Sequence, residues 1–295
     1  MLDYLYLATT LGTALLHESG TRSIVDASGL VGITSVRGDT YDLPDQDGSA
    51  EPPSQRLGAK TMVIQGEVWG PSINAAWQEW DAVAAAFYQV KDTPGMLLWQ
   101  RAGGGLAFQR QVSLAGGVEP PIMDGQNYLQ YAVTLRSIDP AAYAQLVQSQ
   151  VMDPTVGAVG GMSMPVFPVD ANGLTIPLDL GGSGSSSGVT LTNNGNYRAR
   201  VIYTLRGPWS GAWVRNSSTG ATLYTTGLTL AAGELLVIDT GARTVTYQGA
   251  DATAQVDWRQ SEWPLLQPGA NVITIGGSPS AGSQFASSFQ DSYIS

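Results

Sequence analysis

Apolar and polar residues alternate along much of the first 150 residues, and this alternation predicts half-buried β-strands. The pattern is clearest over residues 61–69, TMVIQGEVW. Further strands are expected over residues 96–101, 106–114 and 128–138. The glycines at 103–105 separate two of these segments and suit a hairpin connection.

A helical spacing of apolar residues stands out over residues 75–90, AAWQEWDAVAAAFYQV. Its large apolar residues recur every three or four positions and therefore share one face, which is expected to cover a sheet. They are Trp77, Trp80, Val83, Ala84 and Phe87. Asn74 is the expected N-cap. A second, shorter helix is expected over residues 141–149, after Asp139 and Pro140.

The second half of the chain has a different pattern. Residues 151–188 are low in charge and rich in Gly, Ser and Pro, which is typical of a linker with edge elements. From Val189 onward, short apolar-rich runs alternate with turn signals, which predicts a β-sandwich. We therefore expect a mainly β chain with an α+β first half. The expected domains are residues 1–150 and 189–295, joined by 151–188.

A long segment between two predicted strands, residues 37–60, is rich in Asp, Gly, Pro and Ser. A loop of this length is uncommon inside a compact domain unless it is functional or ordered by a partner. We interpret it as an arm that contacts a neighbouring subunit. The candidate contact residues are Tyr41, Leu43, Pro44 and Leu57.

Composition narrows the classes of function. Charged residues make up 13% of the chain, and a surface poor in charge favours strands and loops over exposed helices. The net charge of −10 disfavours binding to the negatively charged phosphates of nucleic acids. We therefore expect no sequence-specific nucleic-acid binding. Cysteine is absent, which excludes disulfides and zinc–thiolate sites. No apolar run is long enough for membrane insertion, and residues 1–16 read as a strand rather than a signal peptide.

Candidate catalytic chemistry is sparse. His17 is the only histidine, and it lies in a Gly-rich region without a nucleophile signature nearby. Residues 184–188 match G-x-S-x-G, but they lie in a Gly/Ser tract rather than between a strand and a helix. The acids Asp239, Glu234, Asp257 and Glu262 keep a glycosidase open as an alternative. No catalytic residue, cofactor or metal site is assigned.

Aromatic residues in the second half leave a sugar-binding alternative open. A tryptophan on the surface of a β-sandwich can stack on a sugar ring, but large aromatic side chains more often fill a core. Trp209 and Trp213 are the candidate contacts with a glycan or a partner. Trp258, Trp263, Tyr203 and Tyr224 are also available.

Six short pieces in the second half, in order along the chain, resemble distal tail proteins and related minor tail proteins of siphophages. The pieces are 191–196 (LTNNGN), 201–208 (VIYTLRGP), 216–220 (NSSTG), 232–240 (AGELLVIDT), 243–249 (RTVTYQG) and 263–275 (WPLLQPGANVITI). In the first half the resemblance is looser and includes residues 139–143, DPAAY.

This resemblance implies an N-terminal ring-forming belt domain of β-sandwich type with one helix, and a C-terminal sandwich like a galectin or a carbohydrate module. It implies a homohexameric ring at the distal end of the tail in the virion, assembled from subunits made in the host cytoplasm. The implied partners are the major tail tube protein and the tail-tip or adhesion proteins. The family supplies no active site. A carbohydrate-binding tail-tip or cell-surface module and a cell-wall glycan hydrolase remain alternatives, with host-surface polysaccharide as their partner.

Overall fold

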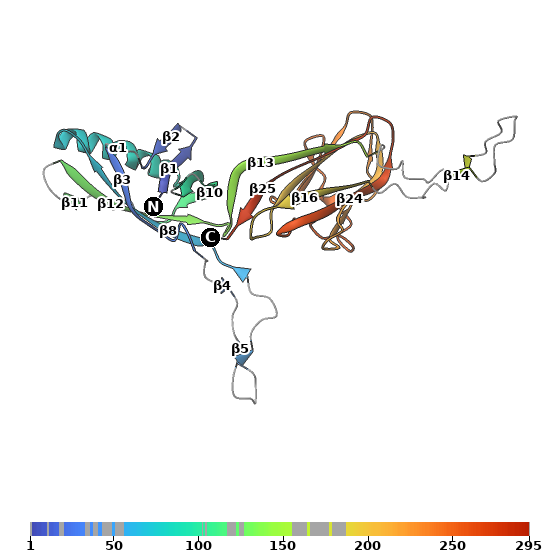
Figure 1. Cartoon of the computed structure of the whole chain (residues 1–295), viewed down its shortest axis with the longest axis horizontal. Coiled ribbons are helices and arrows are strands. Elements are labelled where there is room, and N and C mark those ends of the chain that lie inside the picture. Colours follow the sequence, from blue (N-terminus) through green and yellow to red (C-terminus); the bar gives the residue numbers. More distant parts are fainter. Residues whose placement is uncertain are drawn as a thin grey trace. The chain divides into compact units, whose positions relative to one another are not determined.

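A computed structural model of the chain describes residues 2–10, 12–17, 21–32, 36–37, 41–42, 49–50, 56–101, 103, 105–116, 122–123, 127–154, 164–165, 177–178 and 187–294 (Figure 1). The chain forms two compact units. Unit 1 comprises Met1–Leu146 together with Tyr293–Ser295, and unit 2 comprises Val147–Ser292. The division into a ring domain, a linker and a sandwich stays a prediction.

Two antiparallel sheets build unit 1, and they share one strand, β10. The first has the order β2-β1-β9-β10-β13 and consists of β2 (Gly12–Leu15), β1 (Leu2–Thr9), β9 (Gly95–Arg101), β10 (Ala107–Leu114) and β13 (Ala142–Met152). The second contains β3 (Arg22–Ser28), β8 (Lys60–Trp69), β12 (Tyr128–Ser137) and β11 (Ile122–Met123), with β10 paired to β12. The strands predicted from alternation at 61–69, 96–101, 106–114 and 128–138 are confirmed.

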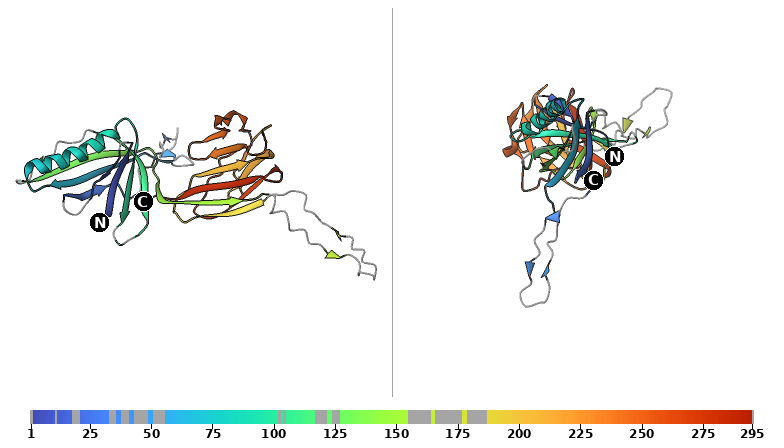
Figure 2. Two further views of the ribbon diagram at one scale, coloured as in Figure 1. Left: turned by 90° about the horizontal axis from the view of Figure 1, so that it is seen from above. Right: turned by 90° about the vertical axis from the view of Figure 1, so that its left-hand side faces the viewer.

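The helix α1 (Ile73–Gln89) runs along the strands of unit 1 (Figure 2) and contacts β8 and β12. Its buried residues include Trp80, Val83 and Phe87, as its periodicity predicts, whereas Trp77 is exposed. The predicted N-cap, Asn74, is wrong. Ser72 has the extended backbone of a cap, and its hydroxyl accepts a hydrogen bond from the Ala75 amide.

The second predicted helix, at 141–149, is also wrong, because this segment lies in β13. Phe108 and Gln109 of β10 pair with Ala144 and Tyr143 of β13, so the backbone groups are satisfied across the sheet. The Asp139 carboxylate accepts hydrogen bonds from the Ala141 amide (3.0 Å) and the Tyr143 hydroxyl (2.7 Å). These bonds fix the start of the strand, and tertiary pairing overrides the helix propensity of an alanine-rich segment.

Unit 2 is a sandwich of two antiparallel sheets. In one, the order is β25-β17-β21-β22-β23, from β25 (Gln284–Tyr293), β17 (Val201–Arg206), β21 (Leu235–Asp239), β22 (Thr244–Tyr247) and β23 (Ala250–Asp251). The other, called here the β18 sheet, has the order β16-β24-β18-β19, from β16 (Ser187–Asn193), β24 (Gly269–Pro279), β18 (Trp209–Asn216) and β19 (Thr222–Tyr224), with β20 (Thr229–Leu230) on β18.

Inward-facing residues of both sheets of unit 2 form one core, which includes Tyr203, Phe285, Trp209 and Ile275. A 3-10 turn, Thr253–Gln255, is the only helical element described in unit 2. The fold class expected from the sequence is therefore confirmed: mainly β, with one α-helix in the first half.

Short strand pairs complete the described structure. They are β4 (Val36–Arg37) with β7 (Arg56–Leu57), β5 (Tyr41–Asp42) with β6 (Ser49–Ala50), and β14 (Met164–Pro165) with β15 (Pro177–Leu178). None of the described helices is long and apolar enough to cross a membrane.

Candidate interaction sites

The edge of β3 is the first candidate interaction site in unit 1. Among the described strands β3 pairs only with β8, so its other edge carries no partner strand. The register shifts between Ile24 and Asp26, which marks a bulge at Val25. The Val25 side chain is 60% exposed. An exposed edge with an apolar side chain is a template for pairing with another chain.

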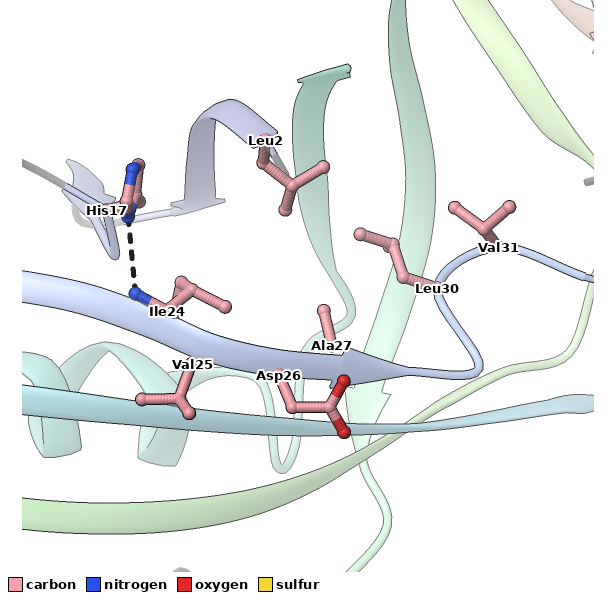
Figure 3. Close-up of a pocket in the computed structure, with 8 residues that line it drawn as sticks. All are labelled: Leu2, His17, Ile24, Val25, Asp26, Ala27, Leu30 and Val31. Atoms are coloured by element: carbon pink, nitrogen blue, oxygen red, sulfur yellow. Dashed lines mark hydrogen bonds between the residues drawn. The ribbon is translucent and has the colours of Figure 1, made fainter. Parts of the chain in front are cut away.

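A cavity of about 430 Å³ opens beside this edge (Figure 3). It is lined mainly by the aliphatic residues Leu2, Ile24, Val25, Ala27, Leu30 and Val31, together with His17 and Asp26. Val31 is 51% exposed, so apolar surface continues beyond the end of β3. The combination of a free strand edge and an apolar pocket suits an added strand whose side chain enters the pocket.

His17 has a structural role in this cavity. Its Nδ1 accepts a hydrogen bond from the Ile24 amide at 3.2 Å, which joins the end of β2 to β3 (Figure 3). Asp26 accepts a hydrogen bond from the Ser28 hydroxyl. Neither contact forms the relay of nucleophile, base and orienting acid that acyl-transfer chemistry requires.

The base of the predicted arm is closed by buried contacts. The Lys60 ammonium donates to the Gly32 carbonyl at 2.6 Å. This bond joins the last residue of the segment 37–60 to the chain just before the segment. Burial, and then the nearby Arg110 guanidinium, lower the pKa of Lys60 to about 8. Gly29 has a φ of +80°, and a Cβ there would lie 2.5 Å from the Thr61 carbonyl oxygen. The backbone before the segment, at Gly29, and the backbone after it, at Thr61, therefore approach more closely than a larger residue at position 29 would permit.

Two of the four predicted arm residues can be placed. Tyr41 lies in β5 and pairs with Ala50. Leu57 lies in β7, pairs with Val36 and is half-buried. Leu43 and Pro44 lie outside the described residues. The interpretation of the segment as an inter-subunit arm stays a proposal.

The two tryptophans predicted to contact a glycan or partner have different environments. Trp209 is 1% exposed, and its Nε1 donates to the Gly276 carbonyl at 3.2 Å. It has no free ring face, so the prediction does not hold for Trp209. Trp213 is half-buried and lies beside Tyr224, with 6.2 Å between ring centroids. A bulge between Ser210 and Trp213 explains why the two rings face opposite sides.

Three of the four candidate acids stabilise their own turns. Asp239 accepts hydrogen bonds from the backbone amides of the β21–β22 turn, at 2.8 and 2.9 Å. Asp257 accepts from the Arg259 amide. Glu234 accepts from the Tyr247 hydroxyl and the Ala231 amide, and the Tyr247 bond is the main reason that its pKa is lowered. Within the described residues, no cluster of three or more metal-ligating side chains occurs.

The short pieces that suggested a family resemblance are the framework of unit 2. Asn216 and Asn271 are fully buried and joined by a hydrogen bond of 3.0 Å from Asn216 Nδ2 to Asn271 Oδ1. Asn271 also accepts from the Gln267 amide and donates to the carbonyls of Gln267 and Gly269. Asn216 donates to the Leu265 carbonyl. These side chains replace the backbone partners that the loops lack.

The N-terminal end of the same framework is built around Asn193. Its side chain donates to the Tyr197 carbonyl and accepts from the Gly195 and Ser292 amides. Asp291 in turn accepts from the backbone amide and the side-chain amide of Asn194. Loop 194–197 is thereby fixed to the end of β25, which is a structural role and not a catalytic one.

Two features of the candidate sites were missed from the sequence. The free edge of β3 was missed because the segment RSIVDAS gives no sign of which strand pairs with it. The covering of Gly276 by Trp213 was missed because the two residues are far apart in sequence, and only the register of β18 and β24 brings them together.

One family of known proteins matches part of the second half of the chain. Residues 194–293 match the family described as siphovirus-type tail component, C-terminal domain. No curated protein matches the chain. Among solved structures, the chain is similar to the Dit protein of phage SPP1, described as a paradigm of hub adsorption apparatus in phages that infect Gram-positive hosts. The identity is 10%, the coverage is 98% of each chain, and the TM-score is 0.61.

Two structures of the phage P2 baseplate in its activated conformation also match, one with Ca and one with Sr. The first has 12% identity, 97% coverage of each chain and a TM-score of 0.47. The second has 13% identity, the same coverage and a TM-score of 0.49. The resemblance predicted from the sequence is confirmed: residues 194–293 match the siphovirus-type tail component family, and the chain has a Dit-like fold.

Proposed function

We propose that this chain is the structural subunit of a distal tail hub, a homohexameric ring at the end of a siphophage tail that joins the tail tube to tip or adhesion proteins. The observation that carries the proposal is the tail-component domain at 194–293 within a chain of Dit-like fold. A structural subunit of this kind needs no catalytic activity. The candidate acids bound in their own turns agree with a non-enzymatic subunit.

Ring closure needs a head-to-tail interface in which two different surfaces of one subunit meet on successive copies. The free edge of β3 and its apolar cavity supply one such surface in unit 1. The segment at 37–60 is a second candidate, because Lys60 and Gly29 fix its base while β5 and β6 pair only with each other among the described strands.

Placing a charge on the β3 edge tests the first surface. We expect Val25→Lys to leave folding of the isolated subunit unchanged, because the side chain is 60% exposed. The same variant is expected to prevent ring formation, since an ammonium would be buried without a partner in the apolar interface. Mass photometry of the assembling protein measures the outcome. Leu106→Lys, at a position 55% exposed, is the matched control that should keep the ring. Normal rings from Val25→Lys would contradict this role for the edge.

Shortening the arm tests the second surface. We expect replacement of residues 38–55 by a short Gly/Ser turn to leave thermal unfolding of the monomer nearly unchanged, because β4, β7 and the Lys60–Gly32 bond stay in place. Ring assembly is expected to fail. A Gly/Ser replacement of the original length separates loss of side-chain contacts from loss of reach. Rings of unchanged size from both variants would show that the arm has no role between subunits.

A further inference from the structure

The outer face of the β18 sheet has properties that the ring does not require. Residues that point into the core of unit 2 alternate with outward residues, and the paired register brings the outward residues of neighbouring strands side by side. The described outward residues are Gly188, Thr190, Thr192, Trp213, Arg215, Thr222, Tyr224, Val272, Thr274 and Gly276. Most of them are small or hydroxylated, so the face is flat and polar around one aromatic pair.

Trp213 lies directly over Gly276 of the neighbouring strand. A Cβ at Gly276 would lie 2.1 Å from Trp213 Cζ2 and 2.2 Å from Cε2, so the indole crosses the glycine in close contact. Gly276 is buried by this contact while Trp213 is only half-buried. The remaining exposure of the indole is therefore on the side away from the sheet.

A similar pair in unit 1 shows what a purely structural contact looks like. Tyr131 lies over Gly66, where a Cβ would meet its Cζ and hydroxyl at 2.4 Å. That ring is then covered by α1, with its centroid 5.2 Å from Trp80, and it is 4% exposed. Trp213 is only half-buried, so part of its indole is open to a ligand.

Polar groups surround the exposed indole. Tyr224 lies beside it, and the backbone of Tyr224 is fixed by the Ser261 hydroxyl and the Asp257 amide. Arg215, exposed, is the next outward residue along β18 and pairs with Thr274. The hydroxyls of Ser217 and Thr274 are joined at 2.9 Å. An aromatic platform with adjoining hydroxyls and a guanidinium can stack on a sugar ring and bind its substituents.

The charge of this face differs from that of the chain. The chain has a net charge of −10, yet Arg215 is the only charged residue among the described outward residues of the β18 sheet. The acids in the adjoining segment are Asp257 and Glu262, and the Asp257 carboxylate accepts hydrogen bonds from the Arg259 backbone amide and the Gln260 side-chain amide. An anionic ligand on the described part of this face therefore meets one guanidinium and no outward-facing carboxylate.

We propose that the outer face of the β18 sheet binds an acidic polysaccharide, with a sugar ring stacked on Trp213 and a carboxylate or phosphodiester group paired with Arg215. This binding is separate from ring assembly, which uses other surfaces of the chain.

The test uses the full chain and an array of defined oligosaccharides that contain uronic acids, phosphodiesters or only neutral hexoses. We expect the acidic oligosaccharides to bind and the tryptophan fluorescence to change on titration with them. Trp213→Ala is expected to weaken binding at least about tenfold. Trp213→Phe, which keeps a flat ring, should retain part of it. Ile202→Ala, which removes a 41% exposed side chain from the other sheet of unit 2, should bind as the unchanged protein does.

Arg215→Gln removes the positive charge of the face and leaves Trp213 in place, so it distinguishes the contribution of charge to binding from that of stacking. We expect it to weaken binding of acidic oligosaccharides to the level of neutral ones and to reduce the dependence of affinity on salt. Equal binding by Trp213→Ala and the unchanged protein would overturn the proposal, as would no binding of any acidic oligosaccharide on the array. A preference for neutral oligosaccharides would also overturn it. Ring assembly is measured separately, so each result leaves the proposed hub function to its own test.

Discussion

Replacing Gly195 by alanine is expected to lower the free energy of unfolding of unit 2 by about 3 kcal/mol or more. A Cβ at this position would lie 1.9 Å from the Ser292 carbonyl oxygen and 2.6 Å from its carbon. The obstructing atoms are backbone, so they cannot move aside as a flexible side chain would. Loop 194–197 must then separate from β25, which also breaks the Asn193 and Asp291 hydrogen bonds.

A matched control is available in the same unit. Gly188 lies in β16, where a new Cβ would meet the Thr274 side chain at 3.6 Å, an ordinary contact distance. We expect Gly188→Ala to change stability by less than about 1 kcal/mol. Chemical denaturation followed by tryptophan fluorescence measures both variants. Equal stability of the two variants would show that loop 194–197 is not held against β25 as described.

Removing the Asn271 side chain is the second large change. We expect Asn271→Ala to destabilise unit 2 by about 3 kcal/mol, because the buried Asn216 side chain and two backbone groups of the adjoining loop would lose hydrogen-bond partners together. These groups are the backbone amide and carbonyl of Gln267 and the side-chain amide of Asn216. Asn216 and Asn271 are both fully buried, so no water can replace the bond between them without entering a buried site.

The double variant of Asn216 and Asn271 makes this second prediction sharper. Since the two side chains are joined, the combined loss in Asn216→Ala/Asn271→Ala is expected to be smaller than the sum of the single losses. Thr226→Ala, at an exposed bend of the same unit, is the control and should change stability by about 0.5 kcal/mol or less. Strict additivity of the pair in urea denaturation would argue against the buried network.

The sequence was informative where side-chain periodicity alone decides the structure. The alternation at 61–69 and the helical spacing up to Phe87 were sufficient to predict β8 and α1. The segment at 141–149 was wrongly predicted because its composition suits a helix, whereas its pairing with β10 decides its conformation. The Asn194–Gly195 pair is typical of a tight turn. Gly195 does not have a positive φ, and what requires glycine is the closeness of β25.

The orientation of the two candidate tryptophans also depends on strand pairing, which the sequence does not reveal. Trp209 and Trp213 are four residues apart, so regular alternation would put both on one face of a strand. The bulge between Ser210 and Trp213, with Gly211 at a φ of +60°, turns Trp209 into the core and Trp213 outward. A bulge depends on the partner strand, and neither spacing nor composition reveals it. The family resemblance identified the framework residues, while the structure explains what each of them holds.

Electron cryo-microscopy of the assembled tail tests the central claim most directly. The proposed function predicts a closed ring of six copies of this chain at the distal end of the tail, between the tube and the tip proteins. In that ring the β3 edge of each copy should be covered by its neighbour. A tail end without a multi-copy ring of this chain, or with the chain bound as a single copy, would contradict the account.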